Sequence, residues 1–214
     1  DDAAFGASLR LPNAVGLRGG IAYKELQQNF YPALGFVSRV NVRDLTVEGG
    51  YTWYPHDRHI RQAFSGIDYQ RIETIEGILQ SEVTTLRAME LTTETGDRIE
   101  FHYQLIDENL DQAFEISDGI NIAAGAYSFD QYCINVNSAG HRALMVEAFY
   151  CGGDFFDGSI SAPGASLTWR PNEHLKFSTG YQISDIELPN GAFTTRLMSL
   201  RADVAFTNTW YWEN

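Results

Sequence analysis

The sequence predicts an all-β protein, an antiparallel up-and-down transmembrane β-barrel that forms a portion of a larger barrel. Apolar and polar residues alternate along most of the chain, and helical periodicity is almost absent. After residue 95, short and long connections between the alternating runs follow one another, as they do in outer-membrane barrels. Trp and Tyr stand near the ends of the runs, where aromatic girdles meet the membrane surface.

The bulk composition limits the function classes. The 214 residues suit one β-barrel domain, 1–214, which we expect to be truncated at both ends because it starts and stops within apparent strands. The net charge of −13 argues against nucleic acid as a partner, because phosphate binding needs a basic surface. No apolar run approaches the length of about 18 residues that a transmembrane helix needs.

Five stretches alternate clearly, and in each of them one face is apolar. They are residues 44–53, 99–105, 142–150 and 196–206, and the stretch 167–181, in which a tight polar turn joins two alternating runs. Several strands run to about 10–13 residues, longer than the usual 5–6 of soluble sheets and long enough to cross a bilayer when tilted. Residues 68–94 alternate poorly, and their register is not assigned.

The connections support the same interpretation. The short ones are 95–97, 137–140, 171–173 and 207–208, and the longer ones are 107–123, 152–159 and 186–192. Because the sequence places a tight turn at 137–140, Cys133 and Cys151 are not expected to face each other, and no disulfide is predicted. An aromatic segment, 29–39, is either a folded-in plug or a loop that packs on its own aromatic rings, and we favour the second interpretation.

Alternation assigns candidate residues to the two faces. The polar face supplies candidates for lining a lumen: Asp44, Glu48, Glu100, His102, Lys176, Arg201 and Asp203. The apolar face supplies candidates for interfacial aromatics: Trp53, Tyr54, Trp169, Tyr181, Trp210 and Trp212. The acidic excess predicts that an open lumen would favour cations.

Four stretches together resemble one bacterial family of unknown function. They are LTWRPNEHLKFSTGYQISDIELPNGAFTTRLMSLRADVAFTNTWYWEN (167–214), NFYPALGFVSRVNVRD (29–44), FEISDGINIAAGAYSFDQY (114–132) and FYCGGDFFDG (149–158). Members are labelled carbohydrate-binding family 9-like domain proteins with a membrane-associated β region. The resemblance implies an outer-membrane barrel that follows a soluble sugar-binding-like sandwich, with further strands after residue 214. It implies no catalytic residues.

We therefore expect a bacterial outer-membrane protein that is a pore, or a membrane anchor for a soluble sugar-binding-like domain. The expected partners are outer-membrane lipid and lipopolysaccharide, with a small solute or carbohydrate. One alternative is a soluble β-sandwich that binds carbohydrate, and another is an assembly scaffold with a plugged lumen. The solute and the oligomeric state are left open.

Other site signals are weak. Asp154 and Asp157 lie in a Gly-rich segment, where two carboxylates offer oxygen ligands to Ca²⁺, although Asp and Gly also serve turns for backbone reasons alone. No other cofactor is expected. No nucleophile or cofactor motif is present, so the protein is not expected to be an enzyme.

Overall fold

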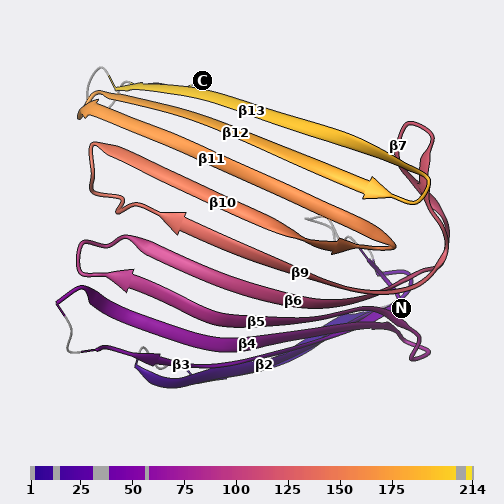
Figure 1. The fold of residues 1–214 in the computed structure, drawn as a ribbon. Coiled ribbons are helices and arrows are strands. Elements are labelled where there is room, and N and C mark those ends of the chain that lie inside the picture. The colour runs from indigo at the N-terminus through magenta and orange to yellow at the C-terminus, as the bar shows by residue number, and fades with distance from the viewer. Residues whose placement is uncertain (1–2, 12–14, 31–38, 56–57, 206–210, 214) are drawn as a thin grey trace.

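The computed structural model describes residues 3–11, 15–30, 39–55, 58–205 and 211–213. They form one sheet of 12 antiparallel strands and a separate hairpin of two strands (Figure 1). The strands are β1 (Ala4–Leu11), β2 (Gly16–Leu26), β3 (Val42–Trp53), β4 (Ile60–Thr74), β5 (Leu79–Thr93), β6 (Arg98–Leu110), β7 (Phe114–Ser117), β8 (Ile120–Ile122), β9 (Gly125–Asn137), β10 (Leu144–Phe155), β11 (Gly158–Asn172), β12 (Leu175–Leu188), β13 (Gly191–Ala205) and β14 (Tyr211–Glu213).

The sheet follows the order of the chain. Each strand pairs with the next, except that β6 pairs with β9 because the hairpin β7–β8 lies between them in sequence. The predicted antiparallel, up-and-down arrangement of long strands is confirmed, with seven of the strands between 13 and 15 residues long.

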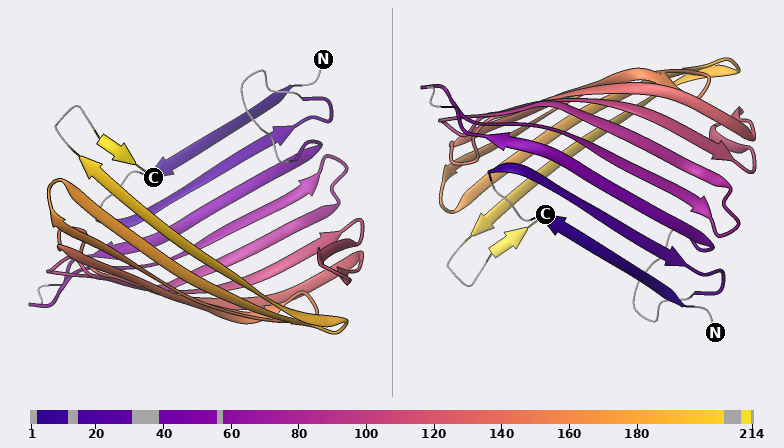
Figure 2. Two further views of the ribbon diagram at one scale, coloured as in Figure 1. Left: turned by 90° about the horizontal axis from the view of Figure 1, so that it is seen from above. Right: turned by 90° about the horizontal axis from the view of Figure 1, so that it is seen from below.

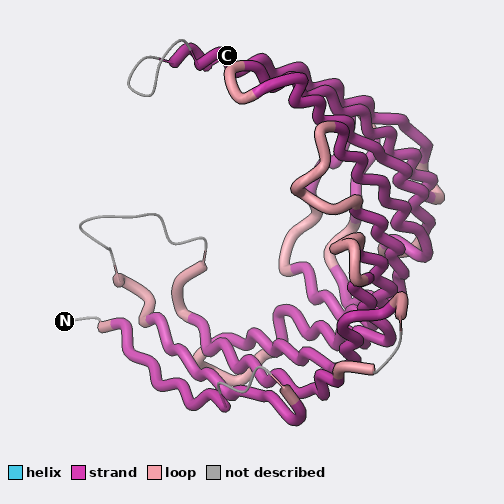
Figure 3. The backbone as a smooth tube through the Cα atoms, turned by 90° about the vertical axis from the view of Figure 1, so that its left-hand side faces the viewer, coloured by secondary structure: helices cyan, strands magenta, loops and turns pink. Residues whose placement is uncertain are grey.

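The sheet curves into an open trough rather than a closed ring. Figures 2 and 3 show a C-shaped wall with β1 along one edge and β13 and β14 along the other. Among the described residues, no pairing joins β1 to β14. The wall therefore has a concave and a convex face, and each strand turns one set of alternating side chains to each.

Two of the predicted long loops are wrong. Residues 152–159 and 186–192 are not loops, because β10 continues to Phe155 and β12 continues to Leu188. Only Phe156–Asp157 and Pro189–Asn190 connect these strands to their neighbours. The long connections at this end of the sheet are 27–41 and 111–124, and most of the aromatic segment 29–39 lies outside the described residues.

The prediction that the two cysteines form no disulfide is also wrong. Cys133 on β9 and Cys151 on β10 are bonded, and their Cα atoms lie 4.2 Å apart at directly paired positions. The reason is the register, because β9 ends at Asn137 and β10 begins only at Leu144. The connection is therefore longer than the turn expected at 137–140, and this brings the two cysteines opposite each other.

We predict a large stability loss when this bond is removed. Replacing both cysteines by serine is expected to lower the free energy of unfolding by about 3 kcal/mol, because the bond closes a loop of 18 residues. Urea titration with and without dithiothreitol measures the loss. The reductant should destabilise the native protein to the same extent and leave the double-serine variant unchanged, and a native protein insensitive to reductant would contradict the prediction.

The largest buried apolar cluster of the described residues lies under the hairpin β7–β8. Ile120 and Ile122 of the hairpin pack with Ile186 and Leu188 of β12, and partly buried side chains surround them, including Phe155 and Phe193. The amide of Asn190 also donates a hydrogen bond of 2.6 Å to the carbonyl oxygen of Asn121. The hairpin thus spans from the β6–β9 side of the sheet to the β12–β13 turn (Figure 1).

Candidate functional site on the concave face

The concave face is identified by contacts that skip a strand. Arg10 of β1 forms an ion pair of 3.1 Å with Glu48 of β3, and Arg18 of β2 lies over the ring of Phe64 on β4. Side chains two strands apart converge in this way only on the inner side of a curved sheet. Directly paired residues on neighbouring strands lie on the same face of a sheet, and so do residues two apart along one strand. The register therefore assigns the concave face on the other strands as well.

The convex face carries a broad apolar band. Leu200 is 68% exposed and Met198 is 64% exposed, although each lies in the middle of a strand pair. Other members of the band are Ile21, Val47, Ile67, Leu86, Leu105, Ile134, Val136, Val146, Leu167, Phe177 and Tyr181. No second sheet covers this band in the part of the chain that the structure describes.

The apolar band ends before the strands do. Toward the hairpin end, the convex face carries ion pairs between Arg43 and Glu25 and between Arg71 and Glu82. A hydrogen bond of 2.6 Å between Thr194 and Asp185 continues this polar border across the sheet. The convex face is therefore divided along the strands into an apolar part and a polar part.

The predicted interfacial aromatics have different positions. Trp53, Tyr54 and Trp169 lie beside the short connections at one end of the strands and are 40%, 43% and 49% exposed. Tyr181 lies in the middle of β12 rather than near a strand end, because β12 extends to Leu188. Trp212 belongs to β14, where its backbone pairs with Val204, and Trp210 lies outside the described residues.

A ring between two arginines is the most distinctive feature of the concave face. Arg18, Gly50, Gly66 and Arg87 are paired in one row across β2 to β5. The ring of Phe64 lies over the two glycines, since a Cβ atom on Gly50 or Gly66 would come within 2.4 or 2.6 Å of it. The guanidinium carbons of Arg18 and Arg87 lie 3.7 and 4.7 Å from the ring centroid. We call this group the Arg18–Phe64–Arg87 stack.

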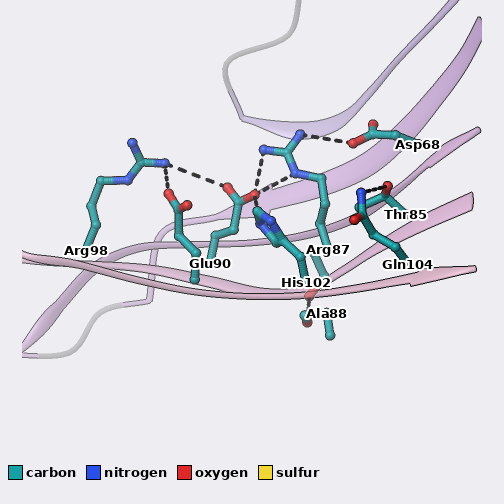
Figure 4. A network of polar contacts seen from close by, with 10 residues as sticks. Asp68, Thr85, Arg87, Ala88, Glu90, Arg98, His102 and Gln104 are labelled. Carbon is teal, nitrogen blue, oxygen red and sulfur yellow. Dashed lines mark hydrogen bonds and ion pairs between the residues drawn. The ribbon is translucent and has the colours of Figure 1, made fainter. Parts of the chain in front are cut away.

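A charged network continues from Arg87 (Figure 4). Arg87 donates to Glu90 at 2.6 Å and lies 3.7 Å from Asp68. His102 contacts the same Glu90 oxygen at 3.2 Å, and Arg98 approaches the other Glu90 oxygen at 3.9 Å. Glu90 is only 8% exposed, so these donors compensate for its loss of water.

The structure places all seven predicted polar-face residues on the concave face, in separate groups. Glu48 lies near the Arg18–Phe64–Arg87 stack, and Glu100 and His102 belong to the Glu90 network through Arg98 and Glu90. Lys176 and Arg201 both pair with Asp203 on β13, at 3.3 and 2.8 Å. Asp44 accepts a hydrogen bond of 3.0 Å from Gln70. Arginines pair with many of these acids, so the acidic excess of the chain is not concentrated here.

Sequence reasoning missed Arg18, Phe64, Arg87 and Glu90. The signal that could have indicated a ring packed on the inward face was the pair of glycines, Gly50 and Gly66, which stand opposite each other there. The β-bulges near Phe64 and Arg87 shift the register and hide the pattern.

A cavity of about 410 Å³ opens beside the stack. Its lining residues are Arg10, Leu11, Arg18, Gly19, Glu48, Gly49, Phe64, Asp68 and Arg87. This volume is within the range of small-molecule sites. Cationic, anionic and aromatic groups meet there, so the cavity can form hydrogen bonds of both polarities beside an apolar ring.

The two candidate metal ligands do not gain further acidic or histidine partners. Asp154 lies at the end of β10 and Asp157 lies in the turn that follows. Across the described ranges, no group of three or more His, Cys, Asp or Glu side chains is arranged to hold a metal ion. Calcium binding at these two residues stays a prediction.

A polar contact joins two short connections at the opposite end from the hairpin. The carboxylate of Asp97 accepts hydrogen bonds from the Thr95 hydroxyl at 2.8 Å and from the Ala139 N–H at 2.9 Å, and it pairs with Arg142 at 2.7 Å. These contacts hold the pKa of the Asp97 carboxyl below its ordinary value. The hydrogen bond from Thr95 is the largest cause, followed by the hydrogen bond from the Ala139 N–H and the charge of Arg142.

The lowered pKa of Asp97 predicts a pH-dependent contribution to stability. A depressed pKa stabilises the fold above the unfolded value of about 3.9, and this contribution is lost as the pH falls through the folded pKa. Asp97→Asn is therefore expected to be less stable than the native protein at pH 7 and to approach it below about pH 4. Urea titrations across this range measure the difference, and a gap that stays constant with pH would contradict the prediction.

The chain matches no protein-family model, no curated protein and no solved structure. Within the described residues, no helix is long and apolar enough to cross a bilayer. The two faces of the sheet are therefore the features from which a function is inferred.

Proposed function

We propose that this chain forms part of the wall of a bacterial outer-membrane β-barrel, with its convex band toward lipid and its concave face lining a polar lumen. The carrying observation is the convex band, which runs from Ile21 on β2 to Leu200 on β13 and leaves large apolar side chains exposed midway along the strands. Burying such a band against hydrocarbon is favourable, whereas leaving it in water is costly.

The division of the convex face supports the same proposal. A membrane barrel needs an apolar band with aromatics at its borders and polar surface beyond it. Trp53 and Trp169 border the band at one end, and the ion pairs of Arg43 and Arg71 border it at the other. The disulfide adds a compartment argument, because such bonds persist in oxidising places such as the periplasm and the cell surface.

Closure is a requirement of the proposal. In lipid, every backbone N–H and C=O must find a partner, so the free edge of β1 and the free edge formed by β13 and β14 have to be paired. The charged groups of the concave face favour a passage for solutes over a simple anchor, because an anchor has no use for an interior of ion pairs such as those of Glu90 and Asp203.

Sedimentation and far-UV circular dichroism test the proposal. The chain is compared in plain buffer and in detergent micelles. We expect aggregation in buffer and a cooperative β signal only in micelles. A folded, monodisperse β protein in plain buffer would contradict the membrane proposal and favour the soluble carbohydrate-binding alternative.

A further inference from the structure

We propose that the cavity beside the Arg18–Phe64–Arg87 stack binds the oxyanion, carboxylate or phosphate, of a small hydroxylated organic solute. The inference needs only the folded sheet. It stands apart from the membrane proposal and can be tested whether or not that proposal holds.

Arg18 presents a guanidinium group to the cavity. Its guanidinium carbon lies over the ring of Phe64, 3.7 Å from the ring centroid. Among the described residues, no carboxylate lies within ion-pair distance of Arg18. An arginine that stacks by its face keeps the N–H groups of its edge for other partners. Those N–H groups match the two oxygens of a carboxylate or phosphate.

The three arginines of the cavity differ in their ion pairs. Arg10 is paired with Glu48, and Arg87 is paired with Glu90 and Asp68. Arg18 therefore supplies the available positive charge. Phe64, only 3% exposed, holds its guanidinium by a cation–π contact, and Gly50 and Gly66 leave the space that the ring requires. The arrangement positions Arg18 before any ligand arrives.

The cavity also has room and hydrogen-bond acceptors for the rest of the solute. A volume of about 410 Å³ is larger than an inorganic anion needs. The carboxylates of Glu48 and Asp68 line the same cavity and are acceptors for hydroxyl groups. A hydroxylated acid, such as a sugar acid or a sugar phosphate, presents an anion to Arg18 and hydroxyl groups to these acceptors.

Isothermal titration calorimetry with glucuronate, glucose 6-phosphate and glucose tests the assignment. The full chain is used in micelles, or in plain buffer if it folds there. We expect at least one of the two charged sugars to bind, at least tenfold more tightly than glucose, and its affinity to weaken with added salt. Binding of glucuronate identifies the carboxylate as a source of the oxyanion, and binding of glucose 6-phosphate alone identifies the phosphate.

Matched variants assign the binding to Arg18. Arg18→Gln is expected to weaken binding of the charged sugar at least tenfold. Lys24→Gln is the control, because Lys24 lies on the same face of β2 outside the cavity, and it should leave the affinity unchanged. Circular dichroism confirms that each variant is folded. Equal binding of glucose, no binding by any of the three sugars, or full affinity in a folded Arg18→Gln variant would overturn the inference.

Discussion

Leu200→Arg is expected to destabilise the protein in a lipid bilayer by about 2–4 kcal/mol, the cost of a charged side chain at the midplane of a membrane barrel. Leu200 is suited to this test because it lies within the apolar band of the convex face and is 68% exposed. It has few protein contacts to lose, so the surrounding medium determines the cost. Urea titration of the protein in lipid vesicles, followed by tryptophan fluorescence, measures the change.

Ser199→Arg is the matched control. Ser199 is adjacent to Leu200 on β13 and points to the concave face, opposite Gly180. An arginine there extends into polar surroundings, so the change in the free energy of unfolding should stay within about 0.5 kcal/mol. Equal effects of the two substitutions would contradict the assignment of the faces.

Ile122→Ala is expected to weaken the docking of the hairpin β7–β8 by about 2–5 kcal/mol. Ile122 is 2% exposed and packs with Ile186 and Leu188, so its truncation leaves a cavity in the buried cluster. The measurement is the rate of proteolysis within 114–122, because a loosened hairpin opens to a protease more often. We expect cleavage to become faster in the variant.

Asn121→Ala is the control for the hairpin. Asn121 lies between the two buried isoleucines and its side chain is exposed, while its carbonyl oxygen still accepts the bond from Asn190. The substitution should leave the cleavage rate nearly unchanged. Slow cleavage of both variants would show that the hairpin is held by contacts other than the isoleucine cluster.

Alternation predicted the strands well wherever the register was regular. In 175–182 it separated Leu175, Phe177 and Tyr181 from Lys176 and Gln182, and the ladder with β13 keeps this division without a shift. The pattern succeeds there because side-chain direction has a period of two in any regular strand.

Turn prediction failed where glycine serves packing instead of a turn. Gly152 and Gly153 belong to β10, although GGDFFDG reads as a loop. The ring of Tyr150 lies against Gly152, and the backbone of Asp130 comes so close to Gly153 that a Cβ atom would collide with it. Such close approaches depend on neighbouring strands and are not visible in a local stretch of sequence.

The candidate site was predicted only in part for a related reason. The seven predicted polar-face residues lie in regular stretches, whereas Phe64 and Arg87 lie next to β-bulges. At one bulge, the hydroxyl of Ser65 donates a hydrogen bond of 2.6 Å to the carbonyl oxygen of Ala88. An extra residue reverses the facing of those that follow, which disturbs the pattern after Arg87. Before it, Arg71 and Glu82 take convex positions that are apolar elsewhere, so residues 68–94 gave no readable alternation.

A spin-label scan along β13 tests the central claim most directly. Single cysteines are placed in turn at 197–203 of the chain reconstituted in lipid vesicles, where both native cysteines are held in the disulfide. The account predicts that labels at Met198, Leu200 and Ala202 collide mainly with oxygen dissolved in lipid. Labels at Ser199 and Arg201 should collide mainly with a water-soluble nickel complex. Equal access of the nickel complex to every position would contradict a lipid-facing convex surface.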